Sequence, residues 1–175
     1  MVRWMVFFIS MMASLTLLTP AMAQDGAPCK AWMASLKDYD AAFERVMRGE
    51  PEDLLHLIRE AREPDRKASA QKRAGEKLSG LRNIVPPREL ASLHGHLVAY
   101  AQAVADAVAA ASPEDAGAKE PALRPCFETL LSYYREMRDL MRKRGCRGGD
   151  LDALEQNLIP RLEQQLAQGT AEAAP

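Results

Sequence analysis

The chain has 175 residues, a length that fits a single domain, and its formal net charge at pH 7 is −1. Basic and acidic side chains number 23 and 24, so the overall charge favours neither nucleic acid nor an anionic membrane as a partner. The sequence also lacks a His-Glu-x-x-His motif, a phosphate-binding glycine loop and the Ser/His/Asp order of hydrolases. We therefore expect a non-enzymatic protein without a cofactor.

The N-terminal stretch is typical of a secretory signal peptide. Arg3 is followed by an apolar run from Trp4 to Leu18, and Ala21-Met22-Ala23 supplies the small residues of a cleavage site. The run is about 15 residues long, whereas a membrane-spanning helix needs about 20, so an uncleaved anchor is the less favoured alternative. We predict cleavage after Ala23, a mature chain without a transmembrane segment, and a periplasmic or extracellular location.

Residue composition predicts an all-α fold. Residues 24–175 hold 26 Ala but only 3 Ile, 5 Val and 2 Thr, and strands depend on β-branched side chains. Many alanines and few aromatic side chains imply that each helix contact buries little apolar area. We predict an up-and-down four-helix bundle with an additional short C-terminal helix, forming one domain over residues 24–168 before a disordered tail at 169–175.

The first two predicted helices are separated by Gly49-Glu50-Pro51. Apolar residues at helical spacing predict the first helix over about 29–48, with a stripe of Trp32, Leu36, Tyr39, Phe43 and Val46. A second stripe continues in phase through residues 51–85, where Pro64 either kinks one helix or divides it in two. We predict one kinked helix whose buried stripe contains Leu54, Leu57, Ile58, Ala61, Ala68, Ala74, Leu78, Leu81 and Val85.

Three further helices are predicted beyond Pro86-Pro87. The third covers about 87–111 and has the most regular stripe, made of Leu90, Leu93, Leu97, Ala101, Val104, Val108 and Ala111. After a connector over residues 112–121, the fourth helix ends at Gly145 and carries Leu123, Phe127, Leu130, Tyr134, Met137 and Met141. A fifth segment, interrupted by Pro160, carries Leu151, Leu154, Leu158, Leu162 and Leu166.

Three cysteines in an exported chain allow one intramolecular disulfide and one free thiol. Cys126 and Cys146 lie at opposite ends of the fourth helix, about 30 Å apart, whereas a disulfide needs Cα atoms within about 7 Å. In an up-and-down arrangement Cys29 lies at the same end as Cys146, so we predict that these two pair. A true chain reversal at Pro64 would make Cys126 the partner instead. As the free thiol, Cys126 is predicted to be buried and inert rather than reactive or bridged to another molecule.

Histidine and methionine side chains suggest a metal or haem site only weakly. His94 approaches the stripe of the third helix, and Met137 and Met141 share one face of the fourth, so they are the candidate ligands for a metal ion or haem iron. The two methionines also complete the apolar stripe, and His96 lies too close to His94 in sequence to share its helix face. We therefore predict core packing for the two methionines and a capping or boundary role for His94.

A cluster of basic residues near the end of the fourth helix is the predicted anion-binding surface: Arg138, Arg142, Lys143, Arg144 and Arg147. Stabilisation of the C-terminal end of the helix dipole accounts for many of these charges, and an anionic partner is the alternative. From these features we predict an exported binding or structural module of the cell envelope, whose partner is an unknown protein or an anionic envelope component. The alternative function is a metal- or haem-binding carrier on a four-helix bundle.

Overall fold

A computed structural model describes residues 26–48, 53–112 and 123–171. Within these ranges all regular structure is helical and no strand occurs, so the predicted all-α class is confirmed. None of the helices in this part of the chain is long and apolar enough to cross a membrane. The proposed signal peptide at residues 1–23 lies outside the described residues.

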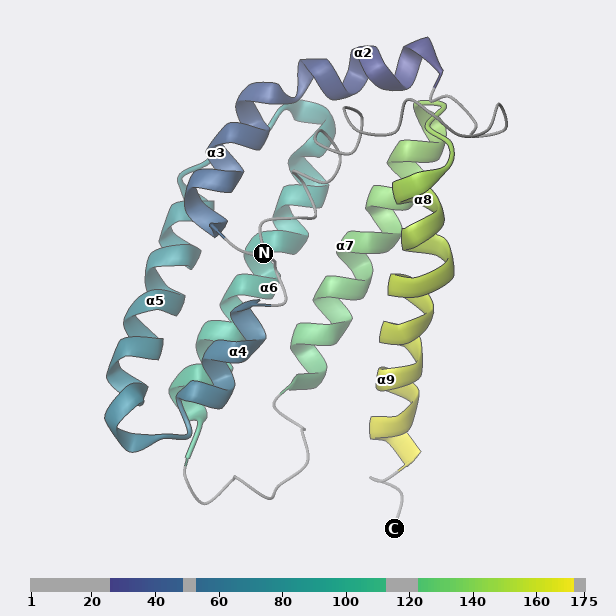
Figure 1. The fold of residues 1–175 in the computed structure, drawn as a ribbon. Coiled ribbons are helices and arrows are strands. Elements are labelled where there is room, and N and C mark those ends of the chain that lie inside the picture. Colours follow the sequence, from purple (N-terminus) through teal and green to yellow (C-terminus); the bar gives the residue numbers. More distant parts are fainter. Residues whose placement is uncertain (1–25, 49–52, 113–122, 172–175) are drawn as a thin grey trace, which may run out of the picture.

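The main helices follow one another along the chain (Figure 1). They are α2 (Ala27–Ser35), α3 (Lys37–Met47), α4 (Asp53–Glu60), α5 (Pro64–Arg82), α6 (Ala91–Ala110), α7 (Arg124–Lys143), α8 (Gly149–Ala153) and α9 (Ile159–Ala171). A 3₁₀ turn, η1 (Arg88–Leu90), precedes α6, and a π turn, η4 (Leu154–Leu158), joins α8 to α9. Because α9 continues to Ala171, the predicted disordered tail begins too early; residues 172–175 lie outside the described residues.

The chain reverses direction at Pro64. Arg73 of α5 forms an ion pair with Glu60 of α4, and farther along α5 the Lys77 ammonium donates to the carbonyl oxygen of Met47 at the end of α3. Rising residue numbers on α5 therefore meet falling numbers on α4 and α3, so α5 runs antiparallel to both. The predicted single helix over residues 51–85 is wrong, and α4 and α5 form a hairpin instead.

Local backbone geometry explains this reversal. Glu63 has φ −88° and ψ 117°, an extended conformation that cannot continue α4. The residue before a proline is pushed toward this region by the proline ring, and Pro64 then opens α5 at its first position. A kink would have required Glu63 to stay helical.

The predicted reversal between the first two helices is also not found, since α3 and α4 run in the same direction (Figure 1). Residues 49–52 themselves lie outside the described ranges. The predicted reversal before α4 is absent, and a reversal that was not predicted occurs at Pro64. The directions of α6 and α7 are therefore the predicted ones. The predicted four-helix arrangement is not confirmed, because its second helix does not exist as one unit.

Helix α6 forms the centre of the fold, packed against α5 on one side and α7 on the other. Its predicted apolar stripe is buried along its whole length: Leu90, Leu93, Leu97, Ala101, Val104, Val108 and Ala111. Helix α5 buries two alanines and two leucines: Ala70, Ala74, Leu78 and Leu81. Ala68, which the sequence places on the buried stripe, is exposed because Pro64 resets the helical phase.

Helices α3 and α5 approach closely at Gly80. A Cβ atom at this position would lie 2.7 Å from Cγ1 of Val46, a β-branched side chain with little rotamer freedom, whereas Gly75 has nothing within 4 Å. We expect Gly75→Ala to raise the free energy of unfolding by about 0.5–1 kcal/mol, because alanine stiffens the unfolded chain and favours helix. Gly80→Ala should instead lower it by about 1–3 kcal/mol, because the overpacking outweighs that gain. Urea unfolding of both variants tests this, and a stabilised Gly80→Ala would contradict the close approach.

Pro160 does not interrupt the last helical segment. In a regular helix the proline would leave the carbonyl four residues earlier without a donor and would clash with it. The π turn η4 absorbs this, since the backbone N–H of Ile159 donates to the carbonyl of Leu154, five residues back. Helices α8, η4 and α9 consequently form one rod beside α7 (Figure 1).

Candidate functional site

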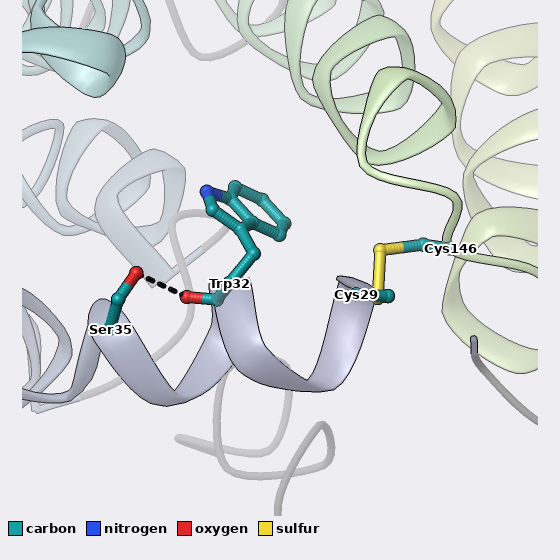
Figure 2. The surroundings of a disulfide bond; sticks show 4 residues. All are labelled: Cys29, Trp32, Ser35 and Cys146. Carbon is teal, nitrogen blue, oxygen red and sulfur yellow. Dashed lines mark hydrogen bonds between the residues drawn. A yellow bond between two sulfur atoms is a disulfide. The ribbon is translucent and has the colours of Figure 1, made fainter. Parts of the chain in front are cut away.

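Cys29 and Cys146 form a disulfide that joins the start of α2 to the turn after α7 (Figure 2). Their Cα atoms are 5.0 Å apart and their sequence separation is 117 residues, in agreement with the predicted pairing. Gly145 has φ +73°, which ends α7 and turns the chain so that the N–H of Cys146 donates to the Met141 carbonyl at 3.0 Å. Both cysteines are 3% exposed, so the linkage is buried at the end of the domain.

Trp32 covers the end of the domain beside the disulfide (Figure 2). Its indole Nε1–H donates to a Glu89 carboxylate oxygen at 3.1 Å, and Glu89 also forms an ion pair with Arg144. The Arg144 guanidinium carbon lies 6.0 Å from the centre of the Trp32 ring, within cation–π range. This network links α2, η1 and the end of α7 around the disulfide.

The predicted basic surface at the end of α7 is largely neutralised within the chain. Arg138 pairs with Asp139 at 2.7 Å, Arg142 pairs with Glu155 of η4 at 2.7 Å, and Arg144 is engaged by Glu89. Lys143 is exposed and, with these arginines, lies in the last turns of the helix, where cations stabilise the dipole. Arg147 lies beyond the helix and also has an interaction of its own. These pairs leave the surface little free charge with which to attract an anion.

The predicted capping or boundary role of His94 is wrong, since its side chain is buried in the core and both ring nitrogens are hydrogen-bonded. The Nε2 atom lies 3.0 Å from the Leu81 carbonyl oxygen, which can only accept, so Nε2 carries the proton. Nδ1 then accepts from the Tyr39 hydroxyl at 3.0 Å. Burial lowers the pKa of His94, which favours this neutral form. Neither nitrogen has a free lone pair for a metal ion.

The other candidate ligands lie in packing positions. Met141 is buried and Met137 is partly buried against the core. His96 and His56 lie at the surface and pair with Glu136 at 3.1 Å and Glu60 at 3.3 Å. Within the described residues no group of three or more His, Cys, Asp or Glu side chains is arranged to hold a metal ion.

Cys126 is fully buried at the start of α7. Burial raises the pKa of its thiol to about 11, so the nucleophilic thiolate is scarce at neutral pH. These properties agree with the predicted inert role and give no support to a reactive or bridging thiol.

A buried carboxyl group beside Tyr39 was not predicted from the sequence. Asp40 is 9% exposed, and burial, aided by the negative charge of Glu44, raises its pKa to about 6. Burial also raises the pKa of Tyr39 to about 12. An acid in the first turn of a helix is normally interpreted as a dipole partner. The sequence signal for the burial of Asp40 was its position three residues before Phe43, at the edge of the apolar stripe.

The raised pKa of Asp40 predicts a pH-dependent stability difference. Because the folded state favours the protonated acid, the contribution of Asp40 is complete below pH 3.8 and is lost as the pH rises through about 6. Asp40→Asn removes this loss, so we expect the variant to gain up to about 3 kcal/mol over the wild type between pH 4 and pH 7. Urea unfolding at both pH values measures the difference.

Two features of this experiment isolate Asp40. The lowered pKa of His94 has the opposite effect, since its contribution is lost as the pH falls below 6.5, but both proteins keep His94 and the effect cancels. Asp38→Asn makes the same change in net charge at an exposed residue of the same helix. A stability gain that does not vary with pH, or an equal gain from Asp38→Asn, would show that Asp40 is not a destabilised buried acid.

A cleft with arginine side chains in its lining, the arginine-rimmed cleft, lies between α4, α7 and α9. Its volume is about 460 Å³. The apolar lining comes from all three helices and includes Ile58, Leu123, Phe127, Leu130, Leu158 and Leu162. Arg59, Arg62 and Arg161 also line the cleft, and none of them forms an ion pair with an acidic residue in the described ranges. Predicting a continuous helix over 51–85 concealed this cleft, because only the hairpin at Pro64 lets α4 face α7 and α9.

The described residues therefore define an all-helical protein with a buried disulfide and a cleft lined by apolar and arginine side chains. No protein-family model, no curated protein and no solved structure matches the chain.

Proposed function

We propose that the protein is an exported, non-enzymatic binding module that acts in the periplasm or outside the cell. Residues 1–23 would serve as its signal peptide and be removed after Ala23. The observation that carries the proposal is the buried disulfide between Cys29 and Cys146, because structural disulfides persist in oxidising compartments and are rare in the cytosol. The bond joins the start of α2 to the turn after α7 in a domain with many alanines, where it has a clear stabilising role.

The arginine-rimmed cleft supports binding as the activity of this module. Its volume of 460 Å³ lies within the range of about 300–1,000 Å³ that small-molecule sites occupy. Such sites combine an apolar lining with a few polar groups that orient the ligand, and the cleft has both. The basic surface at the end of α7 is a weaker candidate for a binding site, because several of its arginines are paired with acids. For the architecture we propose an up-and-down bundle, supported by the alternating directions of α3 with α4, α5, α6 and α7.

The alternative function is a metal or haem carrier that uses His94 with Met137 or Met141. His94 would have to give up its bond to Leu81 or to Tyr39 before it could ligate a metal. No observation favours this alternative, so the binding module is preferred. A featureless visible spectrum and no stoichiometric metal in protein purified from its native compartment would support that preference.

A reporter fusion tests export directly. Residues 1–28 are joined to a phosphatase that becomes active only when its own disulfides form outside the cytosol, and activity is measured in intact cells. We expect strong activity from the native segment and loss of activity from Leu17→Arg, which places a charge in the apolar run. Equal activity from both fusions, or none from either, would contradict export by this segment.

A further inference from the structure

We infer that the cleft between α4, α7 and α9 binds a single-chain amphiphile with an anionic headgroup. The acyl chain would lie along the apolar lining, and Arg59, Arg62 and Arg161 would hold the headgroup. This inference rests on the proposed function and adds the chemical class of the ligand.

Apolar side chains from several elements line part of the cleft. Ile58 comes from α4, Leu158 from η4 and Leu162 from α9. Phe127 and Leu130 come from α7. Each of these side chains is buried or partly buried, so the cleft reaches the main apolar core. A hydrocarbon chain that enters the cleft gains free energy in proportion to the apolar area that it removes from water.

The arginines supply the complementary charge. A guanidinium group is planar, always charged, and matches phosphate and carboxylate oxygens with two parallel hydrogen bonds. Arg59 and Arg161 are exposed and Arg62 is half-buried, so their cationic groups line the cleft where solvent reaches it. Arg59 lies in α4, Arg62 in the turn after it and Arg161 in α9, so the three line one cleft only in the folded protein.

Local stabilisation does not account for all three charges. Arg59 lies in the last turn of α4, where the helix dipole favours a cation. Arg161 lies inside the continuous rod of α8, η4 and α9, away from either end, so the dipole provides no such reason. Arg73 and Arg135 have acidic partners, whereas Arg161, like Arg48 and Arg88, has none in the described ranges. A ligand anion is the partner that this arrangement fits.

The test uses dodecyl phosphate, below its micelle concentration, and isothermal titration of the purified disulfide-linked protein. We expect saturable binding of one molecule per chain. Dodecyl maltoside, which has the same chain and a neutral headgroup, should bind at least about tenfold more weakly, and inorganic phosphate should show no saturable binding. Equal binding of dodecyl maltoside would overturn the role of the arginines. Binding of inorganic phosphate as tight as that of dodecyl phosphate would overturn the role of the apolar lining.

Arginine variants locate the site. Combining Arg59→Gln, Arg62→Gln and Arg161→Gln should weaken dodecyl phosphate binding at least about tenfold. Arg66→Gln is the matched control, since Arg66 is exposed, pairs with Glu63 and lies outside the cleft. Circular dichroism and a peptide map showing the disulfide confirm that each variant is folded. Unchanged binding in the triple variant, or an equal loss in Arg66→Gln, would overturn this site.

The two proposals fail in different ways. An active export reporter with no saturable dodecyl phosphate binding overturns the amphiphile site alone. An inactive reporter with saturable, arginine-dependent binding overturns export and leaves the site standing.

Discussion

Replacing both Cys29 and Cys146 with alanine should lower the free energy of unfolding by about 4–5 kcal/mol. The disulfide spans 117 residues, and a cross-link that closes so long a loop removes many conformations from the unfolded chain. The domain has little to offset this loss, because half of the buried side chains of its long helix α5 are alanine. A change of this size is a large share of the 5–15 kcal/mol that stabilises typical domains, so the variant should be partly unfolded near 37 °C.

Urea unfolding of the oxidised wild type, the reduced wild type and the double variant measures this effect. The reduced wild type should match the double variant, because both lack the same bond. Cys126→Ala is the control, since it removes a buried thiol and keeps the disulfide, and it should lose much less stability. A double variant within 1 kcal/mol of the oxidised wild type would show that the bond is not a main source of stability.

Leu81→Ala should lower the free energy of unfolding by about 2–5 kcal/mol, whereas Val85→Ala should change it by less than about 0.5 kcal/mol. The two residues are four apart and belong to one predicted stripe, yet Leu81 is 0% exposed and Val85 is 90% exposed. Removing Leu81 leaves a cavity beside His94, whose ring donates to the Leu81 carbonyl. Removing methyl groups from Val85 only alters the surface.

Chemical denaturation of these two variants distinguishes the structure from the sequence pattern. A continuous helix through residue 85 would place both side chains in the core, and both variants would then lose stability. Similar losses in Leu81→Ala and Val85→Ala would therefore contradict the end of α5 at Arg82.

Local sequence signals predict α6 well and the segment before it poorly. The stripe from Leu90 to Ala111 has few breaks, since α6 packs between two neighbours along its length. In residues 51–85 the apolar spacing stayed in phase across Pro64, but periodicity carries no information about whether the chain passes straight on or turns back. The choice depends on the backbone of Glu63 and on contacts between α4 and α5 that are distant in sequence.

The disulfide prediction shows how two such errors cancel. The sequence favoured a reversal between the first two helices and a continuous helix through Pro64. In the structure α3 and α4 run in the same direction, and the chain reverses at Pro64. Cys29 therefore still lies at the same end as Cys146. A correct pairing thus did not establish the correct path of the chain.

The cleft and the buried acid depend on tertiary contacts that no single segment encodes. Arg59 and Arg161 are about a hundred residues apart in sequence and give no local motif. Asp40 has the composition and position of an ordinary acid in the first turn of a helix, and only the packing of α3 makes it buried. Conversely, the clustered cations near the end of α7 attract attention in the sequence, although the structure pairs several of them with acids.

The most direct test of an exported, disulfide-linked domain is the intact mass of protein taken from its host, after unfolding in an alkylating reagent without a reductant. We predict a chain that begins at Gln24 and carries one alkyl group, on Cys126, with a peptide map that joins Cys29 to Cys146. A chain that retains residues 1–23 and carries three alkyl groups would contradict both the export and the cross-link.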